Sequence, residues 1–155
     1  KECDGWNFAG VWAHQGNPEV SYDKNIGGGS IKLKLDFTND TEASWSEVKL
    51  ENKFKEKINI NEYNVLTYDF IYNPSEMTIG SFKTKLYSEG AIDTYDDIKL
   101  ENLDDIDGGL KKAKVKVKFA SVNKDIDTLT LAIIGVNTNY KGNIYIDNIE
   151  LSQEK

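Results

Sequence analysis

Residues 29–37 read GSIKLKLDF, and this stretch indicates the fold class of the chain. Every second residue from Ile31 to Phe37 is apolar, the residues between them are lysine or aspartate, and a run of glycines at 27–29 leads into the stretch. Strict alternation with a period of two is typical of a β-strand that has one buried face and one wet face. The stretch therefore predicts a half-buried strand that begins after a glycine turn.

The same alternation recurs along the rest of the chain, over residues 46–50, 66–72, 82–86, 113–119 and 144–149. Residues 128–136 are apolar at both parities, which is expected of a central strand. Several short strands with turn residues between them predict an all-β fold, a β-sandwich jelly roll of two antiparallel sheets. We interpret residues 1–155 as a single module, because this is the usual length of one domain and the chain contains no linker or repeat.

Three segments depart from the alternation. Residues 4–23 show little regular pattern and are expected to form a long loop that packs on the body or lines a site. Residues 93–97 have the composition of a turn. Residues 101–107 are the best candidate for one short turn of helix.

The charge composition argues against several classes of partner. The 155 residues carry a net charge of −7, and all 19 basic residues are lysines. Nucleic-acid and phosphate sites depend on basic patches and on the bidentate guanidinium of arginine, so we expect no nucleic-acid partner. An anionic membrane surface is disfavoured for the same reason, and no apolar run reaches the roughly 18 residues of a membrane span.

The counts of cysteine and histidine limit the chemistry. Cys3 is the single cysteine and His14 the single histidine, which excludes an internal disulfide and a zinc site of the Cys/His kind. A Ser-His-Asp triad would need His14, which has no nucleophile motif near it. No carboxylate stands in an apolar stretch that would prepare it for glycoside hydrolysis. The sequence therefore favours binding over catalysis.

Trp45 is the clearest exception to the hydrophobic pattern. If its strand is regular, Trp45 has the parity opposite to the core residues Val48 and Leu50. It then shares the outer face with Glu47 and Lys49. An exposed tryptophan beside charged groups is costly unless it binds a ligand. We predict that Trp45 is a binding platform, although a loop that covers it would explain the same pattern.

The segment 4–23 interleaves aromatic side chains with amides: DGWNFAGVWAHQGNPEVSYD. Aromatic rings stack on the C–H faces of a sugar, and amides offer directional hydrogen bonds to its hydroxyls. Trp12 and Gln15 are therefore candidate binding residues, with a core position as the alternative for Trp12. Trp6, which follows Gly5, is either a further platform or a core residue at the start of the sandwich.

A second polar row is predicted on the strand at 81–88. Lys83, Lys85 and Tyr87 share the parity opposite to its core residues and are expected to lie beside the face that carries Trp45. Tyr95, in the turn-like segment, would add a ring at the rim. The alternative is an ordinary solvated face.

Asp147 interrupts the apolar alternation near the end of the chain. A carboxylate in a closing strand that meets the N-terminal segment could hold a structural Ca²⁺, together with backbone carbonyls and Glu2 or Asp4. The alternative is a surface acid in an edge strand. Residues 104–109 lack the remaining ligands of an EF-hand and are interpreted as a turn.

Four stretches together resemble a known family: Gly5-Trp6, Gly10-Val11-Trp12, Gly28–Leu33 and the closing IYIDNIEL at 144–151. They are similar to jelly-roll carbohydrate-binding modules, and most of all to the mannan-binding family 27 modules appended to bacterial endo-β-mannanases. The resemblance implies a non-catalytic module with a tryptophan-lined groove for β-1,4-mannan and one structural calcium held in part by Asp147. It maps the groove tryptophans onto Trp45 and onto Trp12 or Trp6.

The chain also departs from the family's pattern. It has no tryptophan after Trp45, so Tyr87 or Tyr95 would serve as a later platform, and the acidic element before the first Gly-Trp is reduced to Glu2.

We therefore expect a secreted, extracellular module that captures β-mannan polysaccharide or mannooligosaccharide and tethers a linked catalytic domain to it. Sugar rings are expected to stack on Trp45 and Trp12, with hydrogen bonds to their hydroxyls from Glu47, Gln15, Lys83 or Lys85. The first residues lack the charged and apolar regions of a signal peptide, which suggests a domain excised from a longer protein. Three alternatives stay open: a related module for xylan or β-glucan, a protein-binding adhesion or scaffold domain, and a small polysaccharide lyase or hydrolase.

Overall fold

The computed structural model describes residues 3–40 and 44–155, and in this part of the chain eleven β-strands carry the fold. The strands are β1 (Trp6–Trp12), β2 (Glu19–Asp23), β3 (Ser30–Asp36), β4 (Ser46–Asn59), β5 (Val65–Tyr72), β6 (Ser81–Ser88), β7 (Ile92–Asp97), β8 (Asp104–Ile106), β9 (Leu110–Lys118), β10 (Asp125–Val136) and β11 (Lys141–Ser152). Four 3-10 turns join them: η1 (Cys3–Gly5), η2 (Ile26–Gly28), η3 (Ile60–Glu62) and η4 (Pro74–Glu76). No helix in the described part of the chain is long and apolar enough to cross a membrane.

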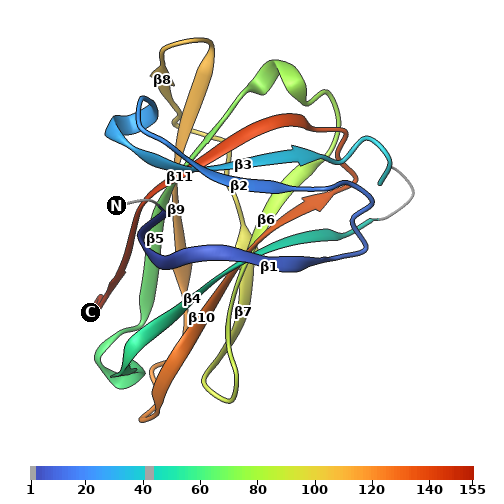
Figure 1. Ribbon diagram of the computed structural model, residues 1–155. Helices are drawn as coiled ribbons and strands as arrows, with labels where there is room; N and C mark the ends of the chain where they lie inside the picture. Colours follow the sequence, from blue (N-terminus) through green and yellow to red (C-terminus); the bar gives the residue numbers. More distant parts are fainter. Residues whose placement is uncertain (1–2, 41–43) are drawn as a thin grey trace.

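The strands form two antiparallel sheets that pack face to face (Figure 1). Sheet A has the order β1-β4-β10-β6-β7, and sheet B has the order β2-β3-β11-β5-β9-β8. The predicted β-sandwich of two antiparallel sheets is thus confirmed. The strand at 128–136, expected to be central, is β10, which pairs with β4 on one side and β6 on the other.

The core lies between the sheets and is built from the alternating apolar residues of both. Leu33 on β3, Leu50 on β4 and Leu131 on β10 are 0% exposed and belong to one cluster. Apolar burial of this kind contributes about 25 cal/mol per Å² and is the main favourable term in folding.

Three expectations about irregular segments are wrong. Residues 4–23 contain β1 and β2 rather than one long loop, and β1 escapes the alternation pattern because a bulge between Phe8 and Gly10 shifts its register against β4. Residues 93–97 lie in β7, where pairing with β6 overrides their turn-like composition. Residues 104–106 form the short strand β8 instead of a helical turn, through pairing with β9.

Candidate functional site

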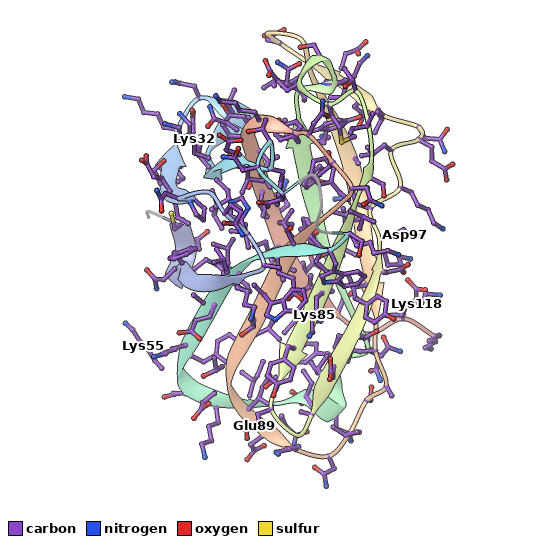
Figure 2. The ribbon with its side chains drawn as sticks, turned by 90° about the vertical axis from the view of Figure 1, so that its right-hand side faces the viewer. Lys32, Lys55, Lys85, Glu89, Asp97 and Lys118 are labelled. Carbon is purple, nitrogen blue, oxygen red and sulfur yellow. The ribbon has the colours of Figure 1, made fainter. Side chains whose placement is uncertain are left out.

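Three rows of side chains cross the outer face of sheet A, the face turned away from the core. Residues directly opposite each other on antiparallel strands point to the same side of the sheet. The register gives a first row of Trp12, Glu47, Ile134, Lys83 and Asp97, a second of Gly10, Lys49, Ala132, Lys85 and Tyr95, and a third of Asn7, Glu51, Thr130, Tyr87 and Asp93. Lys85 lies near the middle of this face, with Asp97 toward its edge (Figure 2).

The floor of this face is apolar and covered. Ala132 and Ile134 are 1% and 0% exposed, although the register places them on the outer side of β10 and they lie outside the core cluster. Their burial therefore comes from the larger side chains around them. A dry floor of this kind strengthens the polar contacts made above it, because water screens them less.

Trp45 and Tyr95 form an aromatic bridge over this floor. Their rings meet edge to face, with centroids 5.4 Å apart and planes at 88°. Tyr95 lies on β7, and Trp45 directly precedes β4. Because β10 and β6 lie between these two strands, β4 and β7 are roughly 14 Å apart at the usual strand spacing. The two side chains therefore reach toward each other across the face.

Trp45 is positioned by its neighbour on the same face. Its indole N–H donates a 2.9 Å hydrogen bond to Oε2 of Glu47, a carboxylate that is itself only 8% exposed. Trp45 precedes the first residue of β4 and is half-buried. The predicted outward parity thus agrees with the structure, and within residues 3–40 and 44–155 the ring that packs against Trp45 is Tyr95.

The two lysines of the face are held by acids and aromatic rings of β7 and β6. Lys83 pairs with Asp97, which raises the pKa of Lys83 above its usual value, and its Nζ lies 6.0 Å from the centroid of the Tyr95 ring. Lys85 lies 3.9 Å from Asp93, and its Nζ is 5.8 Å from the centroid of Tyr87. Cation–π contacts of this type add about 0.5–1 kcal/mol at exposed sites and keep the ammonium groups close to the rings.

Trp12 is the most exposed tryptophan of the face, at 55%. The chain turns sharply after it, because Ala13 adopts a positive φ of 56°, and the next residue, His14, is buried. The Nδ1 of His14 lies 2.6 Å from Oδ2 of Asp40. This buried contact fixes the loop that follows Trp12.

Two candidates from the sequence lie outside the three rows of the face. Trp6 is 6% exposed and belongs to the core cluster, so the structure places it as a core residue and corrects its assignment as a possible platform. Gln15 is exposed in the loop after Trp12, where its backbone N–H donates to Asp40. Its side chain does not line the hollow of the face described next, and neither do those of Trp12, Trp45, Lys83 and Tyr95, which lie beside that hollow.

A hollow of about 270 Å³, here called the first hollow, lies on the outer face of sheet A. It is lined by Ala9, Glu47, Lys49, Glu51, Lys85, Tyr87, Thr130 and Ala132. Carboxylates accept hydrogen bonds and ammonium groups donate them, while Tyr87, 38% exposed, offers an apolar ring. This combination suits a neutral ligand that has both hydroxyl groups and C–H faces.

Several lining residues were not singled out from the sequence. Lys49 was identified only as a neighbour of Trp45, and Glu51 and Thr130 were not considered. Parity would have found Glu51, which follows Glu47 and Lys49 at two-residue spacing. Thr130 and Ala132 lie on an apolar strand whose outward face gives no polar signal, so only strand pairing reveals them.

A cavity of about 170 Å³ near the N-terminal segment, here called the terminal cavity, is the place to test for the expected calcium. Asp4, Ser30 and Asp147 line it. The Ser30 hydroxyl is buried without a hydrogen-bond partner, and Oδ2 of Asp147 would lie 3.0 Å from a Cβ at Gly27. These oxygen donors fit a hard cation, which takes six to eight oxygen ligands.

Other observations bear on the same cavity. Glu2, also expected as a ligand, lies outside the described residues. In the part of the chain that the structure describes, no group of three or more His, Cys, Asp or Glu side chains is arranged for a metal. Any cation there would therefore depend on hydroxyl, backbone or water oxygens besides the two carboxylates.

Asp147 faces a second carboxylate across the sheet. It pairs directly with Asp69 of β5 on the outer side of sheet B. Burial opposes ionisation of Asp69, but hydrogen bonds from Lys114 and Asn148 outweigh this effect and hold its pKa below the usual value. Lys114 and Asn148 thus stabilise the ionised carboxylate of Asp69, whereas Asp147 lines the terminal cavity and has its Oδ2 beside Gly27.

Comparison with known proteins agrees with this architecture. The sequence profile of the family described as carbohydrate binding module 27 matches residues 1–154. No curated protein matches the chain by sequence.

Three solved structures are similar to this chain. A carbohydrate-binding module studied for specific mannan recognition, TmCBM27, shares 18% identity at a TM-score of 0.76 and covers 100% of this chain and 96% of that one. CBM27-1 of Caldicellulosiruptor saccharolyticus, solved with mannohexaose, shares 19% identity at a TM-score of 0.77, over 98% and 92% of the chains. A CBM28 module specific for non-crystalline cellulose shares 15% identity at 0.71, over 97% and 89%. At these identities the similarity shows the fold, a jelly-roll β-sandwich.

Proposed function

Because this chain belongs to carbohydrate-binding module family 27, a family of non-catalytic binding modules, we propose that it binds β-1,4-mannan along the outer face of sheet A. The observation that carries the proposal is the Trp45–Tyr95 bridge beside the first hollow and the exposed Trp12. Two family 27 structures with the same fold were studied for mannan recognition or with mannohexaose bound.

Binding on this face follows from the chemistry of its side chains. The exposed rings of Trp12, Tyr95 and Tyr87 offer apolar surfaces on which the C–H faces of sugar rings stack. Glu51 and Lys49 line the first hollow and supply an acceptor and a donor for hydroxyl groups. Glu47 orients Trp45, and Lys83 is paired with Asp97, so both act mainly by positioning the rings.

We further propose that the module is secreted and linked to a mannanase. A linked catalytic domain held on its polymer works at a high effective concentration of substrate without any new contact. The chain's own part in this arrangement is capture.

Affinity electrophoresis tests the function. The domain is run in gels that contain galactomannan, glucomannan, xylan or mixed-linkage β-glucan, and we expect retardation in the two mannan gels. Tyr95→Ala should reduce the retardation, whereas Tyr22→Ala should leave it unchanged, because Tyr22 is an exposed tyrosine on β2 of the other sheet and lines the terminal cavity rather than the first hollow. Retardation by xylan or β-glucan alone would assign another glycan, and no retardation in any gel would contradict the proposal.

We also propose that the terminal cavity holds a structural Ca²⁺. The carboxylates of Asp147 and Asp4, the unpartnered Ser30 hydroxyl and nearby backbone oxygens are the groups that would hold it. When bound, the cation would neutralise the two carboxylates and join the closing strand β11 to the N-terminal segment. The terminal cavity shares no lining residue with the first hollow, so this role is separate from sugar binding.

A further inference from the structure

The first hollow continues beyond Tyr87. Glu51, Tyr87 and Thr130 also line a second hollow, of about 370 Å³. Its other lining residues are Lys57, Ser88, Glu89, Lys124, Asp125, Ile126, Asp127 and Thr128. Because three residues line both, the two hollows are adjacent parts of one depression along β4, β10 and β6.

The second hollow results from a break in strand pairing. Lys53 of β4 pairs with Thr128 of β10, but the next pair is Ile58 with Ile126. Residues 54–57 therefore stand opposite the single residue Asp127, and β4 bows away from β10. Figure 2 shows Lys55 on this bowed part of β4 and Glu89 at the turn after β6. A bulge that interrupts the pairing of two strands in this way commonly changes the direction of side chains near a binding site.

The position of the aromatic bridge indicates which way a polymer bound in the first hollow would continue. Trp45 and Tyr95 cross the face near Glu47, at one end of the first hollow. A polymer that lies in the first hollow and continues in the opposite direction passes over Tyr87. It then reaches the space between the bowed part of β4 and the β6–β7 turn.

The chemistry of the second hollow suits a neutral polyhydroxylated ligand. Its charged groups are of both signs, with four carboxylates and two ammonium groups among the lining residues. This balance disfavours an anion and offers both acceptors and donors for hydroxyl groups. Lys124 already donates a hydrogen bond to the Glu89 carbonyl at 3.2 Å, whereas Lys57 of β4 and Asp127 of β10 line the hollow and are exposed.

We propose that the second hollow is a separate subsite, which takes a further sugar unit of the polymer bound in the first hollow and hydrogen-bonds it through Lys57 and Asp127. The inference rests on the proposed mannan binding and extends it: the face recognises a longer stretch of chain than the aromatic bridge and first hollow provide.

Isothermal titration with β-1,4-mannotetraose and mannohexaose tests this subsite. The samples are the unchanged domain, the double variant Lys57→Ala/Asp127→Ala, and the control Lys55→Ala, which removes a lysine of the same bowed segment that lines neither hollow. Loss of two hydrogen bonds to exposed groups should weaken mannohexaose binding about five- to tenfold in the double variant. Mannotetraose binding, and both affinities of Lys55→Ala, should stay within about twofold of the unchanged domain.

The possible results separate the two proposals. If the unchanged domain binds both sugars and the double variant matches it on both, the subsite is refuted and mannan binding stands. The same holds if the double variant weakens both sugars equally. A longer sugar also gains affinity from the additional registers it can adopt, but this statistical gain survives in the double variant. If the unchanged domain binds neither sugar, the proposed function is refuted, and the subsite with it.

Discussion

The imidazole of His14 and the carboxylate of Asp40 form a buried pair: Nδ1 lies 2.6 Å from Oδ2, and the side chains are 0% and 3% exposed. The His14 ring also packs against Phe37, with centroids 4.9 Å apart. The chain's only histidine is thus a structural residue that joins the loop after Trp12 to the loop after β3.

His14→Ala should lower the free energy of unfolding by about 3 kcal/mol, because it leaves the Asp40 carboxylate buried without its partner. Urea unfolding followed by circular dichroism measures this loss. Gln15→Ala, at the neighbouring exposed side chain, is the control and should change stability little. Equal stability of His14→Ala and the unchanged protein would show that the pair does not hold the loop.

Trp45→Ala should weaken mannan binding severely without unfolding the domain. It removes one ring of the aromatic bridge, and losing a stacking platform costs about 1–3 kcal/mol. Titration with galactomannan measures the binding, and a melting curve checks the fold. Trp6→Ala is the matched contrast: this ring lies in the core, so we expect a loss of about 3–5 kcal/mol in stability. Normal binding by Trp45→Ala, or its unfolding, would contradict the platform.

The purified domain should not cleave mannan. His14 is buried and paired with Asp40. The carboxylates of the first hollow, Glu47 and Glu51, stand four residues apart on β4, which is roughly 13 Å of strand and exceeds the separation of about 5–9.5 Å between the paired carboxyl groups of a glycosidase. Reducing ends are measured after prolonged incubation with galactomannan. Release of reducing ends that disappears on mutation of one carboxylate would make the domain an enzyme.

Removal of calcium should lower the melting temperature but not abolish sugar binding. A ligand that binds only the folded state adds about 2.7 kcal/mol at a hundredfold excess over its Kd. Melting curves with and without a chelator measure this, and Asp147→Ala should remove the sensitivity. Asp105→Ala, which removes an acid of β8 paired with Lys111, serves as the control and should keep it. A melting curve that ignores the chelator would refute the site. If the chelator-treated domain stays folded but no longer binds mannan, the metal belongs to the sugar-binding face instead.

Stability should fall in alkaline solution, in part through Tyr140. Burial raises the pKa of Tyr140 to about 12, and its hydroxyl donates to the Asn143 carbonyl at 2.6 Å. Tyrosine in an unfolded chain has a pKa of about 10, so the folded protein holds this proton more tightly. The resulting stability, about 2–3 kcal/mol, is fully present below pH 10 and is lost as the pH rises toward 12.

Urea unfolding at several pH values from 8 to 12 measures this slope. Tyr140→Phe should be less stable at pH 8, because it loses the hydrogen bond, but its stability should fall less steeply above pH 10. Burial also raises the pKa of Tyr68, so adding Tyr68→Phe should flatten the curve further. An unchanged slope in both variants would assign the alkaline loss to other groups.

Local alternation predicted much of the sandwich, because a half-buried strand marks its own two faces in the sequence. It placed Trp45 with Glu47, and Lys83 with Lys85 and Tyr87, on outward faces, as the structure has them. It could not find β1, where the bulge before Gly10 changes the parity. It also could not join Trp45 to Tyr95, because that contact depends on which strands lie between them.

The second hollow, too, could not be predicted from local alternation. It depends on residues 54–57 looping out against Asp127, and nothing in the local alternation marks a mismatch between two strands. Whether Trp6 lies in the core or on the outer face could not be predicted for a related reason. Its orientation follows from its pairing with Asn52, and the bulge in β1 lies between Trp6 and Trp12.

The sheet order also bears on how copies of the domain would behave on one polymer if the proposed mannan binding holds. Among the strands of residues 3–40 and 44–155, those at the sheet edges are β1 and β7 of sheet A, and β2 and β8 of sheet B. Each is a poor template for another chain: β1 is bulged, β8 is three residues long, β2 begins and ends with an acid, and β7 carries three aspartates. Such edges discourage edge-to-edge aggregation. Densely packed copies would therefore stay separate particles, and the density of coverage would be set by the spacing of sites on the polysaccharide.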